Sequence, residues 1–155
     1  MESVPYDKRQ GKLWFNGETV DWQDAKIHVL SHGLHYASCV FEGERVYDGE
    51  IFKLEEHTDR LFYSAKRMGI EVPYSQNEIN EACKKILNIQ KVQNGYVRPV
   101  IWRGSEMMAI SAQKNKIHVA IATWEWGSYF DPKLKLNGIR LNISSWRRPS
   151  PNSVP

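Results

Sequence analysis

The chain has 155 residues, enough for one domain with a hydrophobic core, or for one domain and the first element of another. Hydrophobic residues make up 41% and charged residues 25%, which is typical of a soluble globular protein. The formal charge of +3 is too small to indicate nucleic-acid binding, although it suits a small anionic ligand. No apolar run approaches the roughly 20 residues of a membrane helix, so we expect neither nucleic acid nor a membrane as a partner.

The cysteine count and the N-terminus indicate a cytoplasmic protein. Cys39 and Cys83 are too few for a disulfide framework and are interpreted as reduced thiols. The first residues, Met1 to Pro5, lack the basic start and apolar stretch of a secretory signal. Both features are expected of a chain that stays in the cytoplasm.

Two β-hairpins are predicted in the first third of the chain. One spans Lys12 to Val20 and turns at Asn16-Gly17, where both positions tolerate a positive φ. The other lies within Val40 to Lys53 and turns at Asp48-Gly49. The segment between the hairpins, Ile27 to Cys39, has no clean period and is interpreted as a structured connection.

Two amphipathic helices are predicted next. The first spans Leu54 to Met68, before the natural stop Gly69. The second starts at Ser75, which forms a capping-box pattern with Glu78. The apolar faces consist of Leu54, Leu61, Ala65 and Met68 in the first helix, and of Ile79, Ala82, Cys83, Ile86 and Leu87 in the second.

The segments Gly95 to Arg103 and Lys116 to Trp124 are predicted to be strands. The predicted order is then four strands, two helices and two strands. Strands outnumber helices, and most of them are adjacent to another strand in the sequence. This order predicts the α+β class, with a small N-terminal domain that combines a mostly antiparallel sheet and two helices. The start of a second domain, of α/β type, is expected to follow.

The last third of the chain indicates a domain boundary. We expect a small domain over residues 1–125, an interdomain linker or lid over 126–137, and the start of the second domain over 138–155. Gly138 to Trp146 is predicted to be the first strand of that second domain. The Pro-rich end, Arg147 to Pro155, has no closing element, so we expect the chain to be interrupted rather than finished.

Four segments in a fixed order carry a combined pattern: WFNG at 14–17, SHGLHY at 31–36 with VFEG at 40–43, YVRP at 96–99, and SSWRR at 144–148 with PN at 151–152. Together they resemble the branched-chain amino-acid aminotransferases, which are pyridoxal-phosphate enzymes of fold type IV, also called class IV aminotransferases. Each segment alone is weakly specific, but the resemblance covers nearly the whole chain.

The resemblance implies a transaminase that uses pyridoxal phosphate to transfer the amino group of Leu, Ile or Val to 2-oxoglutarate. It also implies a homodimer or a higher homo-oligomer. The Schiff-base lysine of the family is expected about four residues beyond Pro155. No catalytic residue is therefore expected within this chain, which is predicted to be inactive alone.

Arg60 is the predicted cofactor-binding residue. A guanidinium presents a planar set of donors to phosphate oxygens, and the resemblance places the family's phosphate-binding arginine at this position. From the residues alone, the favoured interpretation of Arg60 is a solvated helix side chain paired with Glu56, four residues before it.

Tyr96 and Arg98 alternate along one predicted strand and are expected on the same face, where a hydroxyl and a guanidinium suit a carboxylate. The resemblance implies that Tyr96 contacts the substrate α-carboxylate and that Arg98 receives the distal carboxylate of glutamate. Alternatively, the two residues form the polar outer face of an edge strand.

The resemblance also implies a substrate pocket that accepts aliphatic side chains. Two of its residues, Tyr36 and Ile110, would come from the neighbouring subunit. Gly43 is interpreted as a close approach of the backbone to substrate, or as a requirement of strand geometry. The remaining pocket residues are Phe41, Trp126 and Tyr129. For the aromatic and aliphatic residues of this pocket, plain core packing is the alternative.

His32 and His35 are three residues apart, but no third ligand with suitable spacing is evident, so structural histidines are expected rather than a metal site. Two further functions stay open. One is a related enzyme of the same fold, namely a D-amino-acid aminotransferase or an aminodeoxychorismate lyase. The other is a non-catalytic interaction module that binds a partner through its Trp-rich surface.

Overall fold

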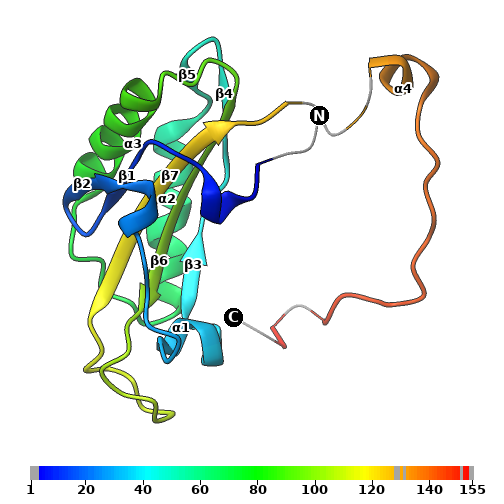
Figure 1. Cartoon of the computed structure of the whole chain (residues 1–155). Coiled ribbons are helices and arrows are strands. Elements are labelled where there is room, and N and C mark those ends of the chain that lie inside the picture. The colour runs from blue at the N-terminus through cyan, green and yellow to red at the C-terminus, as the bar shows by residue number, and fades with distance from the viewer. Residues whose placement is uncertain (1–3, 128–129, 131, 151, 154–155) are drawn as a thin grey trace.

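The computed structural model describes residues 4–127, 130, 132–150 and 152–153. Within these residues a single antiparallel sheet carries two helices on one face (Figure 1), which confirms the predicted α+β class. The sheet order is β2-β1-β7-β6-β4-β5, and β3 also pairs with β6. The strands are β1 (Lys12–Phe15), β2 (Glu18–Asp21), β3 (Cys39–Phe41), β4 (Glu44–Tyr47), β5 (Glu50–Ile51), β6 (Gly95–Arg103) and β7 (Ile117–Glu125).

Both predicted hairpins form, and their turns use the residues that tolerate a positive φ. In the β1–β2 turn, Asn16 and Gly17 have φ values of 50° and 98°. In the β4–β5 turn, Asp48 and Gly49 have φ values of 49° and 80°. Positive φ at both central positions twists a two-residue turn in the same sense as its strands.

The two long helices are α2 (Leu54–Arg67) and α3 (Gln76–Gln90), close to the predicted bounds. Ser75 caps α3, because its side chain accepts a hydrogen bond from the backbone of Glu78 while the Glu78 side chain accepts one from the backbone of Ser75. The buried residues of α3 are those of the predicted stripe: Ile79, Ala82, Cys83, Ile86 and Leu87.

The hydrophobic core lies between α2, α3 and one face of the sheet. Alternate residues of the two longest strands point into it, and Val97, Ile101, Val119 and Ile121 are fully buried. The intervening residues, Tyr96, Arg98, Val100 and Trp102 in β6, point to the opposite face, which carries neither long helix. This second face is called the open face below.

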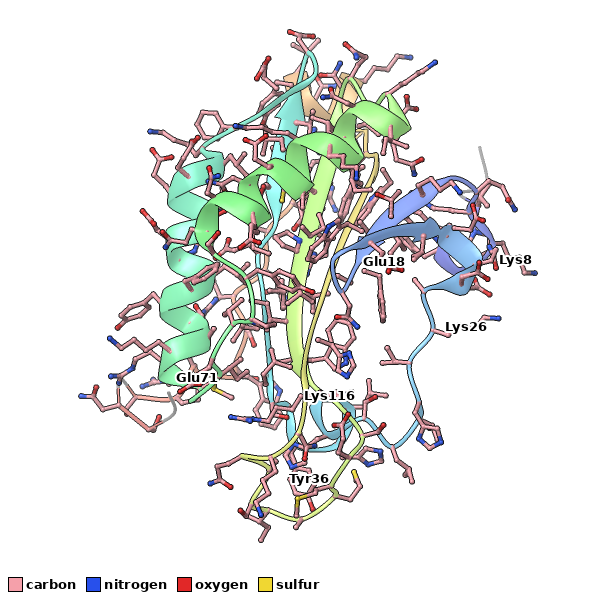
Figure 2. The ribbon with its side chains drawn as sticks, turned by 90° about the vertical axis from the view of Figure 1, so that its left-hand side faces the viewer. Lys8, Glu18, Lys26, Tyr36, Glu71 and Lys116 are labelled. Atoms are coloured by element: carbon pink, nitrogen blue, oxygen red, sulfur yellow. The ribbon has the colours of Figure 1, made fainter. Side chains whose placement is uncertain are left out.

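The connection before β3 contains two short helices, η2 (Trp22–Asp24) and α1 (His32–Tyr36), and a 3-10 turn, η1 (Tyr6–Lys8), precedes β1. Figure 2 shows Tyr36 of α1 at the end of the sheet where the β6–β7 loop lies. Lys8 of η1 lies elsewhere in the same view, beside the β1–β2 hairpin. The two ends of the open face are therefore bordered by different parts of the chain.

The strand predicted over residues 138–146 does not form, which corrects that expectation. This segment has no strand and lies away from the sheet (Figure 1), and Leu141, Ile143 and Trp146 are almost fully exposed. An isolated strand cannot satisfy its backbone hydrogen bonds, and no neighbouring strand is present among the described residues. The predicted linker contains a short helix, α4 (Pro132–Asn137). No helix in the described part of the chain is long and apolar enough to cross a membrane.

Candidate functional site

Three consecutive residues, the last of β3 and the two that connect it to β4, each contact one of the predicted site residues. Phe41 lies under the Arg98 guanidinium, Glu42 pairs with Arg60, and Gly43 faces the Tyr96 hydroxyl. The segment runs along β6, where the Glu42 N–H donates to the carbonyl of Pro99. Because β6 is an interior strand, the alternative interpretation of Tyr96 and Arg98 as edge-strand residues is wrong.

Tyr96, Arg98, Phe41 and Trp126 form an aromatic and cationic cluster on the open face. The Arg98 Nη2 donates to the Tyr96 hydroxyl at 3.1 Å, and the guanidinium carbon lies 4.1 Å from the centre of the Phe41 ring. The rings of Tyr96 and Trp126 meet edge to face, with centres 4.7 Å apart. Phe41 is 57% exposed, so in this chain it is not a core residue.

Gly43 has a steric role that follows from the Tyr96 ring. A Cβ atom at position 43 would lie 1.7 Å from the Tyr96 hydroxyl oxygen. No side chain fits that space unless the ring moves. The backbone at Gly43 therefore approaches Tyr96 closely, and the position of the hydroxyl depends on this glycine.

Arg60 projects from α2 and is oriented by a buried carboxylate. Its Nε and Nη2 donate to the two oxygens of Glu42, both at 2.6 Å, and His57 Nδ1 lies 2.8 Å from the same carboxylate. Burial opposes ionisation of Glu42, but the hydrogen bonds from Arg60 and His57 outweigh it and lower the Glu42 pKa. Glu56, the alternative partner of Arg60, pairs instead with Lys53.

The paired arginine still presents donors to solvent. Its side chain is 65% exposed, whereas the Glu42 side chain is 5% exposed. Glu42 binds the edge of the guanidinium formed by Nε and Nη2, and the Nη1 group is not in that contact. Since a guanidinium carries five N–H donors, Arg60 can bind an anion while Glu42 holds its orientation.

Tyr36 and Ile110 lie at the other end of the open face. The Tyr36 hydroxyl donates to the carbonyl of Met108 at 3.3 Å, and Ile110 in the same loop is 90% exposed. They lie beyond the Arg103 end of β6, where the backbone N–H of His32 in α1 donates to the carbonyl of Gly104. Arg98 is five residues from Arg103 along the strand, which corresponds to roughly 16 Å. Within one chain they do not join the cluster around Arg98. Tyr129 lies outside the described residues.

His32 and His35, two of the three histidines of the connection, make hydrogen bonds within the protein. His32 is buried, with Nδ1 2.6 Å from the Ser38 hydroxyl and Nε2 3.0 Å from the carbonyl of Ala109. His35 Nε2 lies 2.9 Å from the carbonyl of Val29. Among the described residues, no three His, Cys, Asp or Glu side chains gather as a metal-binding group.

Comparison with known proteins assigns the family. The profile of the family described as amino-transferase class IV matches residues 39–155, which is well over half of the chain. The chain belongs to the class IV aminotransferase family. The matched region includes Phe41, Arg60, Tyr96 and Arg98.

Bacterial class IV aminotransferases are similar to this chain along most of its length. The branched-chain-amino-acid aminotransferase of Pseudomonas aeruginosa is 45% identical over 144 residues, which cover 90% of this chain and 47% of that protein. The Escherichia coli K12 enzyme of the same name is 39% identical over 153 residues, covering 96% of this chain and 50% of that protein. The chain thus spans about half the length of the curated relatives it matches.

Solved structures of the family have the same fold as this chain. The crystal structure of the E. coli branched-chain amino acid aminotransferase superimposes with a TM-score of 0.84 at 37% identity, covering 95% of this chain and 50% of that one. The structure of the branched-chain amino acid aminotransferase from T.th., complexed with N-(5'-phosphopyridoxyl)-L-glutamate, superimposes with a TM-score of 0.73 at 37% identity. The match covers 76% of this chain and 41% of that one. The sheet and two helices are therefore the N-terminal domain of a class IV aminotransferase.

Two residues around Arg60, Glu42 and His57, are not among the site residues predicted from the sequence. Glu42 lies within the VFEG segment at 40–43, where an acidic residue between Phe41 and Gly43 indicates a nearby cation. His57 precedes Arg60 by three residues, a spacing that puts both on one side of a helix. Their common contact with Glu42 depends on how α2 packs beside β3.

Proposed function

We propose that this chain is the small domain of a branched-chain amino-acid transaminase. The enzyme would transfer the amino group of leucine, isoleucine or valine to 2-oxoglutarate through pyridoxal phosphate. The observation that carries the proposal is the arrangement around Phe41–Gly43, where Tyr96 and Arg98 lie together on the open face and Glu42 orients Arg60. These are the groups that an amino-acid substrate and a phosphorylated cofactor need.

The substrate pocket must accept an aliphatic side chain and a carboxylate in turn. Arg98 offers a charge for the carboxylate of glutamate, while Phe41 and Trp126 offer apolar surface for the side chain of leucine. Tyr96 would contact the α-carboxylate. The T.th. relative supports this assignment, because its structures carry a phosphopyridoxyl-glutamate adduct and 4-methylvaleric acid, a compound with a branched apolar end.

Arg60 would hold the cofactor phosphate. The exposed donors of its guanidinium and the fixed pairing with Glu42 fit a phosphate group, and the T.th. relative was also solved with pyridoxamine 5'-phosphate. When bound, the cofactor supplies an electron sink for chemistry at the substrate α-carbon. The Schiff-base lysine is expected beyond Pro155, in the part of the relatives that this chain does not span.

The complete site needs further protein around the open face. We propose that residues 126–137 lead from the small domain (1–125) into a second domain that begins within 138–155. Tyr36 and Ile110 would reach the Arg98 cluster of a second subunit, since they lie too far from the cluster of their own chain. The proposed assembly is therefore a homodimer or a higher homo-oligomer with shared sites.

The decisive experiment uses the full-length gene product with pyridoxal phosphate. Transfer from L-leucine to 2-oxoglutarate, with little transfer from D-alanine, is the expected result. A preference for D-alanine would instead favour a D-amino-acid aminotransferase. Borohydride treatment and intact mass measurement should fix one cofactor on a lysine beyond position 155. A full-length protein without transfer or adduct would contradict the proposal and favour an interaction module.

A further inference from the structure

The N-terminal turn η1 is anchored beside the candidate site. The indole nitrogen of Trp22 donates to the carbonyl of Tyr6 at 2.7 Å, and the Gln23 amide donates to the carbonyl of Arg9 at 2.9 Å. The backbone N–H of Trp22 also donates to the carbonyl of Gly11. Helix η2 therefore holds η1 in place at two points, and Figure 1 shows this dark blue turn beside β7.

The Tyr6 ring is held between a cation and an indole. Its centre lies 5.3 Å from that of Trp124 in an edge-to-face arrangement. The Arg9 guanidinium packs on the ring at 4.1 Å from its centre. Although Tyr6 is about half exposed, these contacts fix the direction in which its ring faces.

The ring borders an open surface pocket that is lined by the proposed specificity residues. The volume of this pocket, about 390 Å³, is within the size range of small-molecule sites. Its lining residues are Tyr6, Phe41, Arg98, Val100, Trp124 and Trp126. Arg98 is the charged group of the lining, and four aromatic rings form most of the rest.

We propose that Tyr6 is a specificity-determining residue of the substrate pocket, and that it favours amino acids with aromatic side chains. This inference rests on the proposed transaminase function. A side chain that passes Arg98 and Phe41 meets the rings of Tyr6 and Trp124, which an aromatic group contacts in favourable edge-to-face geometry. Valine has no group long enough to make this contact.

The test measures kcat/KM for L-phenylalanine and L-valine, each with 2-oxoglutarate, in the full-length enzyme. Tyr6→Ala should lower the ratio of kcat/KM for phenylalanine to that for valine by about two- to tenfold, mainly through KM. This change corresponds to the loss of one aromatic pair contact. Tyr6→Phe keeps the ring and should keep the ratio. Tyr63→Ala, which removes an exposed tyrosine of α2, serves as the matched control.

The outcomes separate this inference from the proposed function. If the enzyme is active but Tyr6→Ala leaves the ratio unchanged, or Tyr63→Ala lowers it equally, the proposed role of Tyr6 is wrong. The transaminase proposal is not affected by either result. The same holds if the wild-type enzyme turns over leucine but not phenylalanine. A wild-type enzyme that transfers no amino group from any amino acid overturns the transaminase proposal, and the role of Tyr6 with it.

Discussion

At the scale of single residues, Phe41, Glu42 and Gly43 show how adjacent positions serve different contacts. Alternation along an extended chain sends successive side chains to opposite faces. Phe41 therefore meets Arg98 on the open face, while Glu42 turns toward α2 and Arg60. A substitution at one of these positions should accordingly affect one part of the site.

Replacing Arg98 with leucine tests the dual use of the pocket. The variant removes the charge but keeps apolar contact with Phe41. In the full-length enzyme we expect kcat/KM for glutamate to fall by about 10- to 100-fold, the range of a lost hydrogen bond to a charged group. The value for leucine should change far less. An equal loss for both substrates would refute the assignment of Arg98 to the distal carboxylate.

Glu44 in β4 is a second carboxylate near the site, and it lies in the core rather than at the surface. It is fully buried, and neither oxygen has a hydrogen-bond partner among the described residues. Burial, together with the nearby charge of Glu42, raises the Glu44 pKa to about 8. Near neutral pH the buried side chain is therefore mostly protonated.

This pKa predicts a loss of stability as the pH rises. Between about pH 4.5 and about pH 8 the folded chain keeps a proton that the unfolded chain has released, at a cost to the folded state of about 1.4 kcal/mol per pH unit. Glu44→Gln cannot ionise, so its free energy of unfolding relative to wild type should rise steadily from pH 5 to pH 8 in urea titrations. Glu18→Gln, at an exposed position, controls for the loss of one carboxylate. A pH-independent difference between Glu44→Gln and wild type would rule out the buried titration.

At the scale of secondary structure, local signals specify the elements that support the site. Helix α3 begins where Ser75 and Glu78 satisfy each other's backbone N–H groups, and α2 begins with two acidic residues at its positive end. Both helices bury apolar faces against the sheet. The position of Arg60 on α2 therefore depends on how well this layer is packed.

The capping box of α3 gives a prediction about stability. Ser75→Ala removes the oxygen that accepts a hydrogen bond from the Glu78 N–H at 3.2 Å. The free energy of unfolding should fall by about 1 kcal/mol, as for other N-cap serines. Ser105→Ala, in an exposed loop, should have no comparable effect in the same denaturation experiment. If both variants match wild type, the cap does not contribute to the stability of this chain.

At the scale of the whole molecule, the open face separates two halves of a proposed site. Arg98 and Phe41 lie near the middle of β6, while Tyr36 and Ile110 lie beyond its Arg103 end. If a second subunit brings the two groups together, each site combines residues of both chains. Variants that are defective in different halves should then complement each other.

Mixing two full-length variants tests the shared site. Arg98→Leu and Tyr36→Ala should each show weak glutamate transamination as homodimers. After joint refolding, random pairing should restore about one quarter of wild-type activity, since half of the dimers are mixed and each has one intact site of two. Activity that stays at the average of the two homodimers would show that Tyr36 does not act across an interface.

The sequence alone determined the elements and much of their order. Turn residues with positive φ, a capping box and the periods of helix and strand act over a few neighbouring positions, so the hairpins, α2, α3, β6 and β7 could be predicted. The prediction of a strand over 138–146 is wrong, because the formation of a strand depends on a neighbouring strand as well as on its own residues.

Only the tertiary structure decided which side chains meet. The sequence resemblance pointed to Arg60, Tyr96 and Arg98, but not to Glu42 as the partner that orients Arg60, nor to Tyr6 beside the pocket. These contacts join segments that are distant along the chain. They depend on strand register and on the layer in which each helix packs, which neighbouring residues alone do not encode.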